Sequence, residues 1–313
     1  MSKTKITWTD ETWNPVTGCS KVSHGCKHCY AEREWPRLSV NPKSPYYGRE
    51  FTDVKCHPER LDAPLRWQKQ RMVFVNSMSD LFHEDVPDEF IDQVFTVMAF
   101  ASRHTFQVLT KRPERMRDYL AKLTVDHLMA VAKNMGLLFD FSFGFEALPI
   151  AMPYDHCFAL RNVWLGVSAE DQETANYRIP LLLHTPAAVH FVSAEPLIGP
   201  IDLTRVEMPD GDYLGPSLNN WGADCGIDWV IIGCESGTKA RPMDLGWATS
   251  LVAQCEASKH AKVFVKQIPS SEGLSREQSG TFRVRAGSPI KDMALFPEDL
   301  QYQEFPAVYK GVK

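Results

Sequence analysis

Short apolar runs rich in β-branched residues recur along the chain, separated by longer segments of mixed polarity. Most of these runs lack strict alternation of polar and apolar residues, which is typical of strands covered on both faces of a sheet. We therefore predict strands at Val73–Val75, Phe106–Leu109, Val163–Val167, Val189–Val192, Trp229–Ile232 and Val263–Val265.

Helical patterns lie between several of these runs. Over Glu89–Ala101 one face is formed by apolar residues at helical spacing, namely Phe90, Val94, Val97 and Met98. Pro87 suits a helix start, and further helices are predicted over Arg112–Leu123 and Trp247–Ser258. Repetition of strand, helix and strand predicts an α/β fold with a parallel sheet. About six or seven such units favour a closed or partial β/α barrel over an open sheet.

Polar residues follow each predicted strand. In β/α barrels the chemistry lies just beyond the C-terminal ends of the strands. The six polar segments are Asn76–Asp80, Thr110–Arg112, Ser168–Asp171, Ser193–Pro196, Gly233–Gly237 and Lys266–Gln267. We interpret them together as a functional rim, the alternative being ordinary solvated turns.

Three segments fall outside this rhythm. Residues 124–160 are too long for a plain connection and predict an inserted helical hairpin or lid. Residues 208–227, rich in Gly, Pro and Asn, predict a long loop. We expect residues 1–268 to form the barrel, and the weakly patterned residues 269–313 to form a C-terminal extension that covers one end of it.

Composition and charge narrow the class of protein. The chain is 44% hydrophobic and 23% charged, as in ordinary globular proteins, and it has neither a membrane-length apolar run nor a secretory signal. We therefore expect a cytoplasmic protein, in which disulfides are a poor interpretation of eight cysteines. The net charge of −5 argues against bulk electrostatic binding of duplex nucleic acid but allows a local basic patch.

Three cysteines are concentrated near the N-terminus. Cys19, Cys26 and Cys29 form a C-x6-C-x2-C motif, with Gly18 and Gly25 easing a tight loop and a helix expected to start near Cys29. Thiolates bind soft metals, and the x2 spacing lets two sulfurs reach one metal centre. A 4Fe–4S cluster held by three cysteines leaves one iron open to a small molecule.

Other interpretations of the cysteines stay open. Zinc completed by His24 or His28 is the main rival, although a zinc ribbon usually shows a second pair of ligands. Inert cysteines are the third possibility. Cys56, Cys157, Cys225 and Cys255 are predicted to be packing residues, whereas Cys234 follows a strand among the rim residues and is a candidate donor of a hydrogen atom or proton.

Several blocks of the sequence resemble a phage- and prophage-associated three-cysteine-motif family of radical S-adenosylmethionine (SAM)-like proteins. The resemblance covers about residues 5–268. It is carried by Trp13–Cys19, Gly25–Glu32, Phe74–Phe82, Val108–Pro113, Val163–Ser168, Glu195–Leu197 and Gly233–Gly237.

The resemblance implies a partial (β/α)6-type radical SAM barrel, with the cluster in the loop after the first strand. Electron transfer from such a cluster cleaves SAM to a 5′-deoxyadenosyl radical, and a reductase or flavodoxin-type protein would supply the electron. The SAM-binding residues implied are Asn76, Ser77, Ser79 and Asp80 for the amino group, Ser168 and Glu170 for the ribose or carboxylate, and His28 against the adenine, with Glu195 expected beside them.

The sequence departs from the family pattern in three places. The cysteine spacing is C-x6-C-x2-C rather than the commoner C-x3-C-x2-C. Cys234 stands where a second glycine is expected, and Ile268-Pro269 follow Lys266-Gln267 where an aromatic residue and a glycine are usual. The last two departures fall on the expected substrate side and suggest a specialised substrate.

The charged rim residues predict a polar substrate. Lys111, Arg112 and Arg241 are candidates for binding a phosphate or carboxylate, the alternative for each being a salt bridge. Cys234, Glu235 and Lys266 are the candidate catalytic residues. Together with the phage resemblance, this favours an isomerase- or lyase-type radical modification of a substituted thymine in DNA or a nucleotide. Modification of a peptide or small metabolite, and a non-catalytic zinc-stapled binding module, remain alternatives.

Overall fold

The computed structural model describes residues 4–137, 150–154, 157–208, 211, 213–215, 218–220, 225–270 and 289–306. The chain divides into two compact units. The first unit comprises residues 1–20, 34–166 and 184–190, and the second comprises residues 21–33, 167–183 and 191–313.

Seven strands form one sheet, and the fold is α/β as predicted. Their order is β1 (Glu11–Trp13), β4 (Met72–Val75), β5 (Thr105–Thr110), β8 (Val163–Ser168), β9 (His190–Ala194), β12 (Trp229–Gly233) and β13 (Lys262–Gln267). The pairs β1–β4, β4–β5, β9–β12 and β12–β13 are parallel. All six predicted strands are confirmed. Strand β1 was not predicted, because Glu11 and Thr12 break its apolar pattern.

The first unit carries the N-terminal strands and four helices. Val73 pairs with Glu11 of β1 and with Phe106 of β5. The remaining elements are α2 (Ala63–Arg66), α3 (Asp88–Phe100), α4 (Pro113–Leu120), α5 (Val125–Asn134), the 3₁₀ turn Pro58–Arg60, and the antiparallel pair β2 (Val16–Thr17) and β3 (Lys55–Cys56). The predicted helices Glu89–Ala101 and Arg112–Leu123 correspond to α3 and α4.

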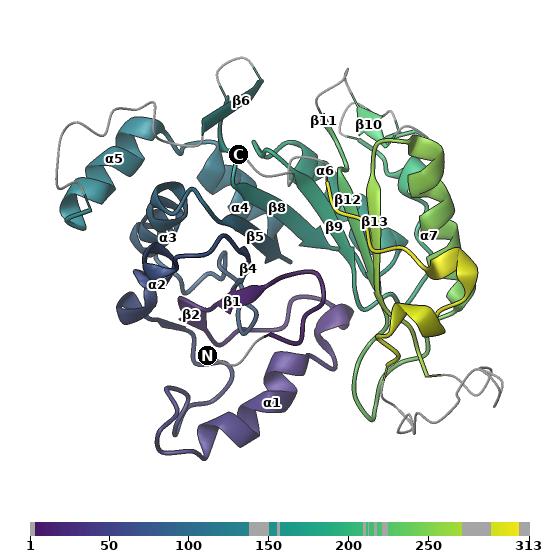
Figure 1. Cartoon of the computed structure of the whole chain (residues 1–313), viewed down its shortest axis with the longest axis horizontal. Coiled ribbons are helices and arrows are strands. Elements are labelled where there is room, and N and C mark those ends of the chain that lie inside the picture. Colours follow the sequence, from purple (N-terminus) through teal and green to yellow (C-terminus); the bar gives the residue numbers. More distant parts are fainter. Residues whose placement is uncertain are drawn as a thin grey trace. The chain divides into compact units, whose positions relative to one another are not determined.

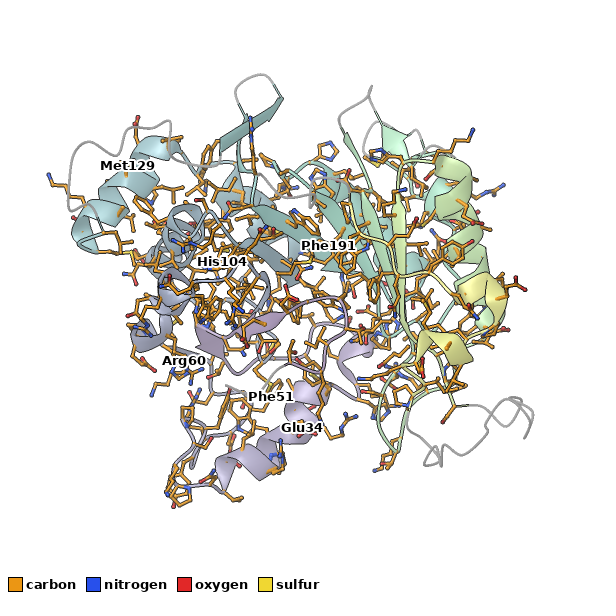
Figure 2. The ribbon with its side chains drawn as sticks, viewed as in Figure 1. Glu34, Phe51, Arg60, His104, Met129 and Phe191 are labelled. Atoms are coloured by element: carbon orange, nitrogen blue, oxygen red, sulfur yellow. The ribbon has the colours of Figure 1, made fainter. Side chains whose placement is uncertain are left out.

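Buried aromatic side chains fill the core of this unit. The rings of Phe82, Phe95 and Tyr119 pack together between the helices. His104, labelled in Figure 2, is 1% exposed and packs edge-on against Trp67, while its Nε2 lies 3.0 Å from the carbonyl oxygen of Pro64. These contacts pack α3 and α4 on the segment that follows β4, and α2 on the residue that precedes β5.

The second unit carries β9, β12 and β13 with helices α6 (Gln172–Leu183) and α7 (Leu245–Ser258), the latter as predicted. Helix α7 packs on β12 and β13 (Figure 1). Residues 289–306 add to the edge of β13, because Val265 N donates to Tyr302 O at 2.8 Å and Glu304 N donates to Val263 O at 2.9 Å. Among the described residues of the second unit, 3₁₀ turns are formed by His24–Cys26, Leu203–Arg205, Met293–Leu295 and Glu298–Leu300.

Helix α1 (Tyr30–Ser39) begins one residue after Cys29, as expected, and belongs to both units. The predicted insertion, expected to be a helical hairpin or a lid, contains α5 followed by an antiparallel strand pair, β6 (Ile150–Tyr154) and β7 (Cys157–Leu160). Residues 138–149 lie outside the described residues. The predicted loop 208–227 includes a short pair, β10 (Asn219–Asn220) and β11 (Cys225–Gly226). Over the described part of the chain, no helix combines the length and apolarity needed to cross a membrane.

Candidate functional site

The segment after β4 holds the chain that leads to Cys19 in the first unit. Asn76 adopts a left-handed conformation, with φ of 60°. Its Oδ1 accepts from the backbone amide of Val16 at 3.2 Å, and Ser79 Oγ donates to the carbonyl oxygen of the same residue at 2.8 Å. Ser77 Oγ donates to Asn14 Oδ1 at 3.2 Å. These predicted cofactor residues therefore fix β2, which ends two residues before Cys19.

The backbone at Cys19 is fixed from a second side. Gly18 has φ of 93°, and a side chain there would overlap the carbonyl oxygen of Asp53. Cys19 N donates to Phe51 O at 2.9 Å, while Cys19 as a residue is part-exposed. The loop therefore holds the backbone tightly and leaves Cys19 part-exposed.

A polar network surrounds the Cys19 sulfur within the first unit. We call it the Cys19 network, and its members are Cys19, Ser20, Asp80, His83, Glu84 and Arg112. The Arg112 guanidinium, which is almost buried, donates to Cys19 Sγ at 3.7 Å. Its pKa is raised although burial opposes this, because Asp80, Cys19 and Glu84 favour its charge. Hydrogen bonding to its own backbone amide, and then Arg112, lower the pKa of Glu84 to about 2 against the opposing effect of burial.

His83 completes the network as a neutral imidazole. Burial, and then Arg112, lower the pKa of His83. The backbone amide of Asp85 donates to His83 Nδ1 at 3.1 Å, so the ring proton is on Nε2, which lies 2.8 Å from Ser20 Oγ. Ser20 Oγ in turn donates to Glu84 Oε1 at 3.2 Å. Arg112 Nη2 also donates to Ser20 Oγ, at 2.8 Å, so the residue after Cys19 is held by three side chains.

The second unit carries Cys26 and Cys29 on the loop of residues 21–29, which we call the cysteine loop. Ser23 Oγ lies 3.9 Å from Cys26 Sγ and donates to Glu170 Oε2 at 3.4 Å. His24 Nε2 lies 2.7 Å from Asp171 Oδ2. Gly25 packs so closely on Glu170 that a side chain at this position would overlap the carboxyl group. Two acidic residues after β8 therefore hold the loop.

Positive charge accompanies these thiols too. The pKa of Lys21 is raised, mainly by its hydrogen bond to Glu32 and further by Cys29 and Cys26. Asp171 stays ionised, because hydrogen bonds from Thr174 and His24 lower its pKa in spite of burial. Both cysteines are part-exposed.

Glu170 is itself part of a buried ion pair. Arg178, on α6, donates to both Glu170 oxygens at 3.1 and 3.2 Å and to the carbonyl oxygen of Ser168 at 2.8 Å. The Ser168 and Glu170 residues predicted to bind SAM are thus brought together by an arginine that sequence reasoning missed.

A second charged pair joins the ends of β9 and β13. Lys266 Nζ lies 2.6 Å from Glu195 Oε1 and 2.8 Å from Oε2, and Gln267 Nε2 donates to the carbonyl oxygen of Cys234 at 2.7 Å. Burial, followed by the negative charge of Glu195, raises the pKa of the Cys234 thiol to about 12. Cys234, whose thiol stays protonated, therefore lies beside three residues of the predicted rim, namely Glu195, Lys266 and Gln267.

The loop after β12 reaches back to the cysteine loop within the second unit. Arg241 Nη2 lies 2.5 Å from Glu235 Oε1, and Arg241 Nη1 donates to the carbonyl oxygen of His24 at 2.9 Å. Burial alone would raise the pKa of Glu235, but Arg241 and, more weakly, His28 lower it. Arg33 donates to the carbonyl oxygen of Ser236.

The predicted cationic residues are engaged with carboxylates. Arg112 pairs with Asp80 and Glu84, Arg241 with Glu235, and Lys266 with Glu195. The backbone amide of Lys111 donates to Asp80 Oδ2 at 3.0 Å. The salt-bridge alternative therefore applies to these three cations.

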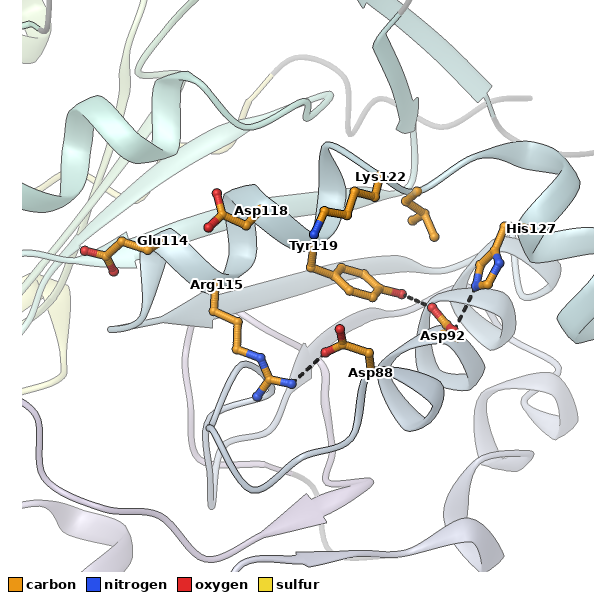
Figure 3. A pocket seen from close by; sticks show the side chains of 9 residues that line it. Asp88, Asp92, Glu114, Arg115, Asp118, Tyr119, Lys122 and His127 are labelled. Atoms are coloured by element: carbon orange, nitrogen blue, oxygen red, sulfur yellow. Dashed lines mark hydrogen bonds and ion pairs between the residues drawn. The ribbon is translucent and has the colours of Figure 1, made fainter.

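A cavity of about 600 Å³ in the first unit is lined by α3, α4 and α5 (Figure 3). In it Tyr119 Oη donates to Asp92 at 2.7 Å, and His127 Nε2 lies 2.8 Å from the same carboxyl group. The pKa of Tyr119 is raised, first by burial and then by Asp92. No predicted site residue lines this cavity.

The donor chemistry of the cysteines fits a thiolate-bound group. Cys19, Cys26 and Cys29 are part-exposed and have Arg112 or Lys21 nearby; Cys56 is part-exposed as well, whereas Cys234 and Cys255 are buried. Among the residues that the structure describes, no group of three or more His, Cys, Asp or Glu side chains is arranged as a metal site. Cys19 belongs to the first unit and the other two cysteines to the second.

Sequence reasoning missed Ser20, His83, Glu84 and Arg178. His83 and Glu84 follow the polar segment Asn76–Asp80 after two apolar residues, and that interruption hid them. Arg178 lies on α6, where no helix was predicted, so its two-turn distance from Glu170 gave no signal.

Comparison with known proteins identifies a family, but the description of that family names no function. A family model described as "Protein of unknown function (DUF5131)" matches residues 3–284, and the chain belongs to that family. No curated protein and no solved structure matches it.

Proposed function

For a chain of this family, we propose an iron–sulfur enzyme of the radical SAM type, in which Cys19, Cys26 and Cys29 hold a 4Fe–4S cluster. When bound, such a cluster supplies an open iron for the amino and carboxylate groups of SAM and the electron that cleaves SAM. The proposal rests on the three-cysteine motif and on one observation, namely that these three cysteines are part-exposed and have a cationic side chain nearby.

That observation separates the three cysteines from the buried ones. Arg112 donates to Cys19 Sγ, and the charges of Cys26 and Cys29 raise the pKa of Lys21. Cysteines that bind metals or react typically sit in part-exposed, positively charged surroundings. By contrast, burial raises the pKa of Cys255 to about 12, which disfavours its thiolate.

The proposed roles of the chain's own residues follow from their contacts. Ser23, Glu170 and Arg241 hold the cysteine loop. Glu195 and Lys266 carry opposite charges beside Cys234, and we assign them to orienting the polar groups of SAM and substrate. The raised pKa keeps Cys234 as a thiol, and an S–H group is what donation of a hydrogen atom requires.

Anaerobic purification and reconstitution test the cluster. We expect a brown protein with absorbance near 400 nm and about four irons per chain, which converts SAM to 5′-deoxyadenosine under reducing conditions. Cys26→Ala should lose most of the iron and the cleavage, whereas Cys255→Ala, at a buried cysteine outside the motif, should keep both. A colourless protein with one zinc would support the zinc-stapled module instead.

The proposed substrate, a substituted thymine in DNA, has its own test. Reduced enzyme is incubated with SAM and hypermodified phage DNA, and the nucleosides are then separated by mass. New nucleosides that depend on both SAM and enzyme are expected. Unchanged nucleosides, with 5′-deoxyadenosine formed equally without DNA, would exclude this substrate while leaving the cluster chemistry intact.

A further inference from the structure

The Arg112 guanidinium has a partner for each of its N–H groups. Nε donates to Glu84 at 2.9 Å, and Nη1 donates to Asp80 at 3.3 Å and to Cys19 Sγ at 3.7 Å. Nη2 donates to Ser20 Oγ at 2.8 Å and to the Ser20 carbonyl oxygen at 3.4 Å. An arginine has five N–H donors, so these five contacts leave none for an anionic substrate.

Asp80 fixes the orientation of this guanidinium. Its Oδ1 accepts from Thr110 Oγ1 at 2.8 Å and from Phe82 N at 3.0 Å, while its Oδ2 accepts from Lys111 N as well as from Arg112. Asp80 and Arg112 are both almost buried. A carboxylate with four donors in a buried site has little freedom to turn, and the planar guanidinium paired with it is equally restricted.

The other side of the Arg112 guanidinium, at Nη2, is fixed through Ser20. Its hydroxyl accepts from Arg112, interacts with neutral His83 and donates to Glu84. The N–H of Nη1 is thereby directed at the Cys19 sulfur from a frame built by the ends of β4 and β5. All of these residues belong to the first unit.

We propose that Arg112 is a positioning residue that donates a hydrogen bond to the Cys19 sulfur, and that this bond makes the cluster easier to reduce. Hydrogen bonds and positive charge at a ligand sulfur favour the reduced, more negative state of an iron–sulfur cluster. The inference rests on the proposed cluster, and it assigns Arg112 to that cluster instead of to substrate binding.

The experiment compares the midpoint potential and the electron paramagnetic resonance spectrum of reconstituted variants during anaerobic dithionite titration. Arg112→Gln should lower the equilibrium constant for reduction at least tenfold, which is about 59 mV for a one-electron couple, and should alter the g values. Arg112→Lys, which keeps a charge but not the fork, should restore part of the shift. Arg117→Gln removes a part-exposed charge from α4, the helix that begins directly after Arg112, and should change neither readout.

A second pair of variants guards against misfolding. Arg112→Gln leaves Asp80 as a buried carboxylate without a cationic partner, so Asp80→Asn is compared with Asp80→Asn/Arg112→Gln, in which no buried charge of this pair remains; the Glu84 carboxylate that also loses Arg112 is exposed. The double variant should show the lower potential. Equal potentials in this pair, with iron bound, would overturn the role of Arg112 alone. A wild-type protein that binds no iron would overturn the proposed function, and this inference with it.

Discussion

Arg178 Nη1 lies 3.1 Å from Glu170 Oε2, with the two side chains 4% and 0% exposed. The pair is buried between the end of β8 and helix α6, and Ser23 and Gly25 of the cysteine loop contact the same glutamate. Glu170 therefore links the interior of the second unit to the loop that carries Cys26 and Cys29.

Removing one charge of this pair should be costly. Glu170→Gln leaves the Arg178 charge uncompensated in the interior, and we expect a loss of about 3–5 kcal/mol in the free energy of unfolding, measured by urea denaturation. The double variant Glu170→Met/Arg178→Met removes both charges and should recover most of that loss. If the double variant were no more stable than Glu170→Gln, the uncompensated charge of Arg178 would not be the cause of the lost stability.

Gly25→Ala should disturb the cysteine loop directly. The added methyl group overlaps the Glu170 carboxyl, so we expect destabilisation of roughly 1–3 kcal/mol and a lower iron content after reconstitution. Lys27→Ala, at an exposed position of the same loop, is the matched control and should retain both stability and iron. If Gly25→Ala bound as much iron as the wild type, the cysteine loop would have to rearrange freely around Glu170.

Alkylation should separate the three motif cysteines from the two buried cysteines Cys234 and Cys255. In the metal-free protein at pH 8, iodoacetamide should label Cys19, Cys26 and Cys29. Cys234 and Cys255, which are 2% and 1% exposed with pKa values of about 12, should react at least ~100-fold more slowly until the protein is unfolded. Peptide mass spectrometry measures each rate. Equal labelling of Cys234 and Cys26 in the folded protein would contradict the burial.

His104 should make the protein less stable in mild acid. Burial lowers its pKa from 6.5, so the folded state binds the proton less readily than the unfolded state. Its contribution is complete above pH 6.5 and is lost as the pH falls through the lowered value, at up to about 1.4 kcal/mol per pH unit. Thermal unfolding between pH 7.5 and 5 should show a shallower decline for His104→Gln. The exposed control His184→Gln should follow the wild-type curve.

The strands could be predicted because their apolar runs are covered on both faces. Val73–Val75 and Trp229–Ile232 lie within β4 and β12, where every residue is buried. Strand β1 escaped prediction, since half-exposed Glu11 and Thr12 supply two of its three residues. Its pairing with β4 depends on tertiary structure, which no local pattern encodes.

The sequence predicts where the residues of the candidate site lie in the sheet better than it predicts which of them contact one another. Parallel topology places Glu195 and Lys266 at the ends of β9 and β13, and the structure pairs them. The partner of Arg112 could not be read from the sequence, because Asp80, Glu84 and an anionic substrate all satisfy a guanidinium equally well. Only the three-dimensional arrangement shows that Asp80 and Glu84 take those donors.

The strand-like addition at β13 has a consequence for where the chain can be shortened. Tyr302 and Glu304 satisfy backbone groups of Val265 and Val263, and Trp229 Nε1 donates to the Glu304 carbonyl oxygen at 2.9 Å. A chain ended at Ile268 would leave that edge open to pairing with a second copy. Removing the residues after Ile268 would therefore be expected to give a fragment that self-associates.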